Sequence, residues 1–155
     1  MKLVAQELTI AAPPEVVYQF LVDPDLFLQW MADAATLEPV PGGLIRWTHA
    51  NGDVCAGRYL ELIPDRRVVF TYGWERAEVE IPPGSTTVTV ELHPDGTDAT
   101  RLRLTHAGLD DLAADAHHGG WTHYLQRLRH ASEGHPPGPD PFANQRVPTP
   151  AELAP

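Results

Sequence analysis

Short alternating segments follow one another through the middle of the chain, with turns between them. Apolar side chains stand at roughly every second position of residues 44–49, 54–63, 67–74, 85–93 and 98–106. This pattern is typical of strands that bury one face. Asn-Gly, Pro-Asp and Asp-Gly pairs occupy the shorter turns and favour hairpins. Because short turns join strands that run in opposite directions, the sequence predicts an antiparallel meander rather than β-α-β units.

The segment at residues 67–74 lies at the centre of this meander and is rich in aromatic side chains. One of its faces carries Val68, Phe70, Tyr72 and Trp74. On the next two strands, we expect the same face to carry Val88, Val90, Leu102, Leu104 and His106. One face of the predicted sheet is therefore apolar, and a further element has to cover it.

Two short helices are predicted between a first strand at residues 3–10 and the meander. Pro14 and Glu15 favour the start of the first helix. The Asp23-Pro24 pair ends this helix and caps the second one. The apolar side of the second helix is expected to include Trp30.

Residues 111–133 are the candidate cover for the sheet. Their C-terminal half carries an apolar stripe at helical spacing, formed by Trp121, Tyr124, Leu125 and Leu128. Gly119-Gly120 interrupts this region, and each glycine destabilises a helix by about 1 kcal/mol relative to alanine. Two interpretations stay open. Either the helix starts near the glycines, or the glycines allow a close approach to the sheet.

Residues 134–155 contain seven prolines and few side chains that form cores. Such a composition favours an extended or disordered segment. We therefore predict a folded domain at residues 1–133 and a proline-rich C-terminal tail at residues 134–155. The tail has the character of an arm, and we add a homodimer to the predictions on that ground.

Charge and cysteine content exclude several classes of function. The net charge of −10 repels phosphate groups, so we expect neither nucleic acid nor a membrane as a partner. A single cysteine, Cys55, leaves no internal disulfide and no cysteine-based zinc cluster, which suits the cytoplasm. The first ten residues alternate and lack the apolar core of a signal peptide. No apolar run approaches the ~20 residues that span a bilayer.

Several local motifs occur in an order and spacing that identify a family. They are Val17–Pro24 with Trp30, Pro41–Gly43, Gly57–Pro64, Arg67–Thr71, Ser85–Val90, Thr100–Leu109, and Gly120-Trp121 with Leu125 and Leu128. Together they cover most of residues 4–131. The chain resembles START-like and Bet v 1-like helix-grip domains of the SRPBCC superfamily. More narrowly, it resembles the bacterial relatives of the activator of heat-shock-protein-90 ATPase.

The resemblance implies an α+β helix-grip fold, in which a curved antiparallel sheet wraps around a long C-terminal helix and two short helices follow the first strand. In this superfamily, the space between sheet and helix is commonly a cavity for an apolar ligand. Relatives include lipid carriers, polyketide cyclases and the co-chaperone itself. The resemblance therefore implies a small hydrophobic molecule, or a chaperone or other protein, as the partner.

Eleven side chains are candidates for the wall of such a cavity, because aromatic and apolar groups line most small-molecule sites. They are Trp30, Trp47, Tyr59, Phe70, Tyr72, Trp74, Val90, Leu104, His106, Trp121 and Leu125. The alternative is that the same side chains simply fill the core.

Histidines are the best candidates for acid–base chemistry, and His106 and His117 lead among them. With His118 they would form a three-histidine metal site. However, His117 and His118 are adjacent and would point apart on a helix. We therefore expect no metal and no cofactor.

Three functions stay open on this basis. A module that binds a small molecule fits the aromatic inner face and the missing catalytic motif. An enzyme of cyclase, isomerase or dehydratase type would need a polar dyad inside the pocket. A protein-interaction module would have a filled interior and an exposed apolar patch.

Overall fold

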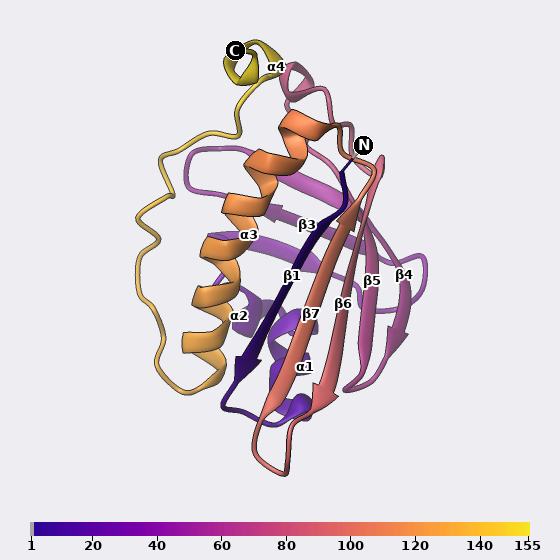
Figure 1. The fold of residues 1–155 in the computed structure, drawn as a ribbon, viewed down its shortest axis with the longest axis vertical. Helices are drawn as coiled ribbons and strands as arrows, with labels where there is room; N and C mark the ends of the chain where they lie inside the picture. The colour runs from indigo at the N-terminus through magenta and orange to yellow at the C-terminus, as the bar shows by residue number, and fades with distance from the viewer. Residues whose placement is uncertain (1) are drawn as a thin grey trace.

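A seven-stranded antiparallel sheet curves around a long C-terminal helix in the computed structural model, which describes residues 2–155 (Figure 1). The strands lie in the order β1-β7-β6-β5-β4-β3-β2. The elements are β1 (Val4–Ile10), α1 (Pro14–Val22), α2 (Pro24–Phe27), β2 (Ala34–Leu37), β3 (Leu44–Thr48), β4 (Val54–Ile63), β5 (Arg67–Tyr72), the 3-10 helix η1 (Ala77–Val79), β6 (Thr86–Pro94), β7 (Thr100–Ala107), α3 (Asp111–Ser132) and α4 (Pro150–Leu153). The predicted α+β helix-grip fold is confirmed.

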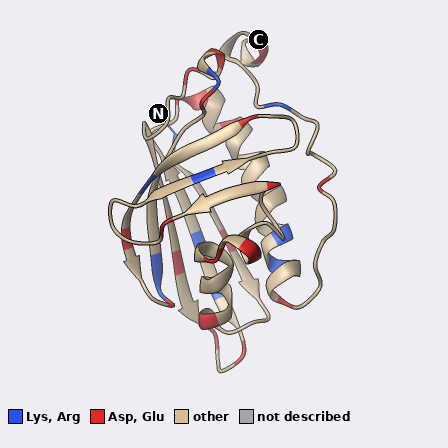
Figure 2. Cartoon of the chain, turned by 180° about the vertical axis from the view of Figure 1, so that it is seen from behind, with Lys and Arg blue, Asp and Glu red and all other residues tan. Residues whose placement is uncertain are grey.

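The inner face of the sheet carries the predicted apolar rows. Val68 pairs with Val90 across β5 and β6, and Val90 pairs with Leu104 across β6 and β7. All three side chains are buried. The alternate positions point outward and carry charges, as on Arg67, which binds Glu61 at 2.9 Å and Glu91 at 3.1 Å. Figure 2 shows basic and acidic positions side by side on these strands.

The sheet differs from the sequence-based expectation at two places. β2 was not predicted, because its sequence Ala-Ala-Thr-Leu is short and has little strand propensity; it is held by pairing with β3. β5 ends at Tyr72 rather than Trp74. Beyond Tyr72 the chain leaves β6 but stays beside β4, where the Gly73 carbonyl oxygen accepts from the Ala56 amide at 3.0 Å and Trp74 keeps an isolated bridge to Cys55. Gly73 packs directly against the backbone of Pro82, where a side chain would clash.

α3 runs without a break through Gly119 and Gly120. It begins more than one turn before them, where the Asp110 carboxylate caps the amide of Ala113 at 2.9 Å. A Cβ atom on either glycine would meet nothing within 4 Å. Both interpretations of the glycine pair are therefore wrong: the helix does not start there, and the glycines are not pressed against the sheet.

The short helices close the lower end of the sheet (Figures 1 and 2). Asp23 caps α2 by accepting from the amides of Asp25 at 2.9 Å and Leu26 at 3.2 Å, as its place before Pro24 predicts. Trp30 lies just beyond α2, and its indole N–H donates to the Phe20 carbonyl oxygen at 2.9 Å. This bond ties the two short helices together beneath α3.

Residues 134–155, which we call the strap, leave the end of α3 and run back along the helix towards its N-terminal end (Figure 1). Apart from α4, the strap forms no regular helix or strand. Of the helices in the described part of the chain, none is both long and apolar enough to cross a membrane.

We expect Gly57→Ala to lower the free energy of unfolding by about 3 kcal/mol or to prevent folding, because overpacking against backbone cannot relax. Gly57 lies inside β4, and a Cβ there would clash with the carbonyl oxygen of Thr71. Urea unfolding monitored by circular dichroism measures the loss. Arg58→Ala, at the exposed neighbouring position, is the control and should change the stability much less.

Candidate functional site

A cavity of about 390 Å³ lies between α3, the inner face of the sheet and the strap. The sheet and the segment after α2 line it with Met31, Trp47, His49, Asn51, Tyr72 and Trp74. α3 lines it with Ala116, His117, Gly119, Gly120, Trp121 and Tyr124. The strap lines it with Phe142, Gln145, Arg146, Val147 and Pro148. The cavity therefore has walls from three separate parts of the chain.

Aromatic rings form the floor of the cavity, with Tyr72 at their centre. The ring centroid of Tyr72 lies 5.9 Å from that of Trp47, 5.6 Å from that of Trp74 and 6.1 Å from that of Trp121. All four residues are buried. Burial raises the pKa of Tyr72 well above its usual value, so the phenol stays neutral. The floor is a neutral, largely apolar surface.

Each of three tryptophans donates its indole N–H to a histidine. The nitrogen pairs are Trp47 Nε1 with His49 Nε2 at 3.1 Å, Trp74 Nε1 with His117 Nε2 at 3.1 Å, and Trp121 Nε1 with His106 Nδ1 at 3.0 Å. An indole nitrogen can only donate, so each of these imidazole nitrogens must carry a free lone pair. The three histidines are therefore neutral.

The second nitrogens of His117 and His106 are engaged as well. His117 Nδ1 donates to the Ala113 carbonyl oxygen at 2.8 Å, one turn earlier on α3. His106 Nε2 donates to Thr86 Oγ1 at 2.9 Å, and that hydroxyl donates to the Tyr72 carbonyl oxygen. Burial lowers the pKa of both imidazoles, and that of His106 falls to about 3 with a further contribution from His117. Neither ring has a free nitrogen to exchange a proton with a substrate.

A polar chain leads from the cavity wall to the strap. The Tyr124 hydroxyl lies 3.5 Å from His49 Nδ1 and donates a hydrogen bond to Asp140 Oδ2 at 2.6 Å. Asp140 also accepts from His123 Nε2 at 2.7 Å. Burial, together with the bond to Asp140, raises the pKa of Tyr124, whereas burial lowers that of His49. The chain fixes the orientation of both cavity-lining rings.

The eleven candidate residues separate into three groups by depth. Four of them line the cavity: Trp47, Tyr72, Trp74 and Trp121. Five lie deeper, around a void of only about 20 Å³: Trp30, Phe70, Val90, Leu104 and Leu125. Tyr59 and His106 line neither space, and the buried Tyr59 hydroxyl has no hydrogen-bond partner among the described residues. The lower half of the sheet–helix interface is thus packed, and the open space lies at the upper half.

Several residues that line the cavity were not among the candidates. His49 and Tyr124 could have been included, because His49 shares a strand face with Trp47 and Tyr124 lies on the stripe of Trp121. The glycine pair also carried a signal, since glycine inside a helix needs a reason. Residues 142–148 of the strap gave none, because their contacts depend on the folded surface beneath them.

No group of three or more histidine, cysteine, aspartate or glutamate residues that could hold a metal ion occurs within residues 2–155. His106 and His117 do come together, with ring centroids 5.6 Å apart. His118 is exposed on the other side of the helix, as its adjacency to His117 implies. The three-histidine arrangement is not formed.

We expect the stability to fall as the pH is lowered from about 6.5 to about 4.5. The unfolded chain takes up a proton at His106 near pH 6.5, whereas the folded chain does so only at a pKa of about 3. Each such histidine therefore removes about 1.4 kcal/mol per pH unit across this window. Urea unfolding at pH 7, 6 and 5 measures the slope. His106→Gln keeps an acceptor for Trp121 and should reduce the slope of stability against pH. An unchanged slope would contradict the lowered pKa of His106.

Comparisons with known proteins agree with the fold. Solved structures of similar fold include an AHSA1-like protein from Rhizobium etli, which is 38% identical, with a TM-score of 0.69 over 95% of this chain and 91% of that one. A protein from Mesorhizobium loti has a TM-score of 0.75 at 22% identity, over 84% of this chain and 96% of that one. The Aha1 dimer from Colwellia psychrerythraea has a TM-score of 0.72 at 24% identity, over 86% and 98%. The last two likenesses show the fold alone.

The sequence itself gives the family. A search of curated proteins finds no match. The model of the family described as Activator of Hsp90 ATPase homolog 1-like protein matches residues 11–133, and this confirms the resemblance drawn from the sequence. The match spans most of the chain, which therefore belongs to the Activator of Hsp90 ATPase homolog 1-like protein family.

Proposed function

We propose that this protein binds a small, largely apolar aromatic molecule in the cavity between α3, the sheet and the strap. The volume of about 390 Å³ lies within the ~300–1,000 Å³ of ordinary small-molecule sites. Flat rings can pack against the indole and phenol faces of the floor by stacked or edge-to-face contact. We place the protein in the cytoplasm, because its single cysteine is free and buried.

The glycine pair of α3 is the observation that carries this proposal. Gly119 and Gly120 line the cavity, and a Cβ on either of them would touch no neighbour within 4 Å. Alanine would therefore fit at both positions and would stabilise the helix by up to about 1 kcal/mol each. Two glycines at unobstructed helical positions are best explained if a bound molecule approaches the helix backbone there.

Polar recognition comes from the roof of the cavity rather than from the floor. The indole N–H groups of the floor are already bonded to histidines. Gln145 and Arg146 of the strap line the roof, with Asn51 of the β3–β4 turn beside them, and Arg146 is the one charged residue among the described lining residues. We expect the ligand to be held mainly by shape and ring contacts, with its polar substituents towards the strap.

The histidine bonds favour binding over acid–base catalysis. A general base needs a nitrogen within reach of the substrate and free to accept a proton. His117 lines the cavity, but both of its ring nitrogens are engaged; the His106 ring is also fully engaged, and it lies outside the cavity. A polar dyad of the kind that a cyclase needs would have to use other groups.

Native mass spectrometry of the purified protein, before and after denaturation, is the primary test. A co-purifying small molecule that is lost on denaturation supports the proposal and identifies the ligand class. If no molecule is retained and no aromatic compound binds on titration, the proposal is overturned. The protein-interaction function that the family description names would then be the one to pursue, together with the dimeric state described for the Colwellia relative.

We expect Gly120→Ala to raise the free energy of unfolding by about 0.5–1 kcal/mol and to weaken the binding of an aromatic probe. Gly120→Leu should abolish binding, because the side chain enters the cavity. Thermal unfolding and titration with N-phenyl-1-naphthylamine measure the two effects. Gln126→Ala, at an exposed position of the same helix, is the control and should leave the affinity unchanged. Full affinity in Gly120→Leu would place the probe elsewhere.

A further inference from the structure

The strap forms the roof of the cavity without becoming part of the core. Five of its residues, from Phe142 to Pro148, line the cavity. The structure describes all of residues 134–155, and none of them is buried. Segments with few buried contacts open at low free energy, well below that of global unfolding. Val147 packs at the margin of the core and the Phe142 ring contacts that of His123, but the hydrogen bonds that hold the strap to the rest of the protein occur at two places.

The first anchor lies near the end of α3. Asp140 accepts from Tyr124, from His123 and, at 2.9 Å, from the amide of Phe142. Arg127 adds a bond of 2.8 Å to the Gly138 carbonyl oxygen. Apart from Phe142, these partners belong to α3, which leads directly into the strap. This anchor consequently holds the start of the strap to the helix.

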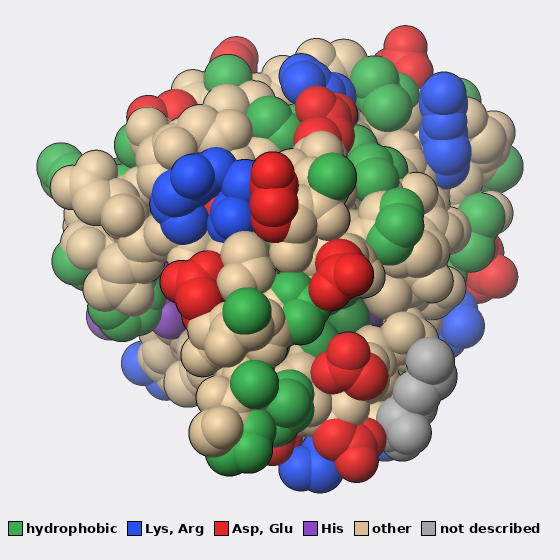
Figure 3. Space-filling model, turned by 90° about the horizontal axis from the view of Figure 1, so that it is seen from above, with side chains coloured by type: hydrophobic (Ala, Val, Ile, Leu, Met, Phe, Trp, Pro, Cys, Tyr) green, Lys and Arg blue, Asp and Glu red, His purple; other side chains and the backbone are tan. Residues whose placement is uncertain are grey.

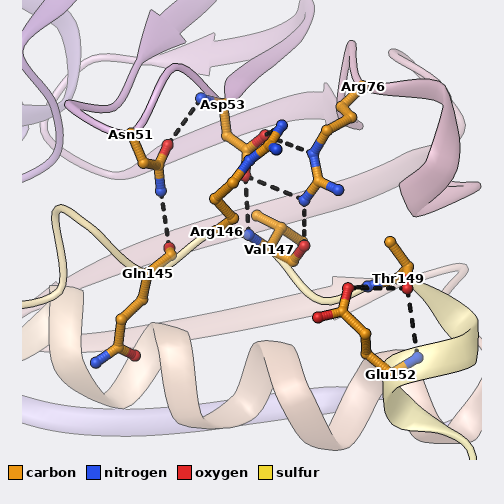
Figure 4. Close-up of polar contacts among 8 residues, drawn as sticks. All are labelled: Asn51, Asp53, Arg76, Gln145, Arg146, Val147, Thr149 and Glu152. Carbon is orange, nitrogen blue, oxygen red and sulfur yellow. Dashed lines mark hydrogen bonds and ion pairs between the residues drawn. The ribbon is translucent and has the colours of Figure 1, made fainter.

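The second anchor lies on the sheet and is centred on Asp53, whose side chain is 1% exposed. Figure 4 shows its partners converging from the strap and from the segment after β5. Arg76 donates to both carboxylate oxygens, at 2.8 Å and 3.3 Å, and the Val147 amide donates to Oδ2 at 2.8 Å. Arg76 also bonds the Val147 carbonyl oxygen, and Arg146 lies 3.5 Å from the carboxylate.

One more bond completes the second anchor. Asn51 donates to the Gln145 carbonyl oxygen at 2.8 Å, and its own carbonyl oxygen accepts from the Asp53 amide at 2.7 Å. The contacts of this anchor that reach the strap all end on residues 145–147, the segment that roofs the cavity. A buried carboxylate bonded to a guanidinium and an amide is strong while it is dry, and its loss leaves these donors unpaired.

The strap is loosely packed beyond the second anchor. The bonds of Thr149 and Glu152 stay within the α4 turn. A hollow of about 310 Å³ lies beneath α4, between Leu112, Ile81 and Leu153. Figure 3, which looks down on this end of the molecule, shows apolar side chains exposed between acidic and basic ones. Among the described residues, no hydrogen bond or ion pair joins residues 148–155 to the rest of the protein, so only the packing of α4 on α3 would hold this part of the strap once the second anchor opens.

We propose that the strap is a gate over the cavity and that Asp53 is its latch, so that release of residues 145–147 from Asp53 limits the entry and exit of the ligand. The first anchor keeps the strap attached while its distal part swings away. This inference rests on the binding function proposed above. It assigns a role to a buried ion pair that lies outside the aromatic floor.

Opening of the latch can be measured without a ligand. Trypsin cleaves after Arg146 only when the bonds of Val147 to Asp53 and Arg76 are released. In Asp53→Asn, we expect cleavage of the Arg146–Val147 bond to accelerate at least tenfold. The loss of the intact chain, monitored by mass spectrometry, measures the rate. Glu75→Gln removes a carboxylate that pairs with Arg46 in an exposed ion pair nearby, and it should leave the rate unchanged. Equal cleavage rates in all three proteins would overturn the latch.

Stopped-flow binding of N-phenyl-1-naphthylamine tests the gate itself. In the wild type, the observed rate should reach a plateau as the probe concentration rises, because gate opening becomes limiting. Asp53→Asn should raise this plateau at least tenfold, and Glu75→Gln should not. A wild-type rate that stays linear overturns the gate and leaves the proposed function standing. No binding by any of the proteins overturns both.

Should Asp53→Asn fail to fold, the same bond can be removed from the strap. Val147→Pro lacks the amide that donates to Asp53, whereas Val147→Ala keeps this amide and loses two methyl groups. The gate requires a raised plateau in Val147→Pro only. The same plateau in both variants overturns it.

Discussion

A buried indole N–H needs an acceptor, and the upper half of this structure is arranged around that need. Trp121 on α3 donates to His106 on β7, and Trp74 beyond β5 donates to His117 on α3. The two bonds cross the sheet–helix interface in opposite directions, which sets the height and rotation of α3 on the sheet. Because neutral imidazoles serve as the acceptors, the indole N–H groups are satisfied without placing a charge in the floor of the cavity.

Packing and open space are divided between the two ends of the interface. Around Phe70, Leu104 and Leu125 the side chains leave only about 20 Å³, which is close to the space of a single water. Above Tyr72, about 390 Å³ stays open. The lower end supplies the stability that lets the upper end remain hollow, so a single apolar interface serves both the fold and the site.

Alternation in the sequence predicted the meander and its inner face, because Val68, Val90 and Leu104 must point the same way on paired strands. It could not say which inner residues surround space, since depth depends on how far α3 stands from each strand. Gly119-Gly120 was misread for the same reason: a sequence shows missing side chains but not what lies opposite them. The position of the strap could not be predicted from the sequence, because its contacts, such as Val147 with Asp53, join residues 94 positions apart.

The indole pairs also have an optical consequence. Three of the four tryptophans, Trp47, Trp74 and Trp121, form the cavity floor, and Trp30 lies in the packed region below. Indole emission depends on the polarity of its surroundings and on its hydrogen-bond partner. Three of the four indole emitters of this protein therefore lie at one place, where an arriving molecule would change their surroundings. The chain carries its own reporter of occupancy, with no label attached.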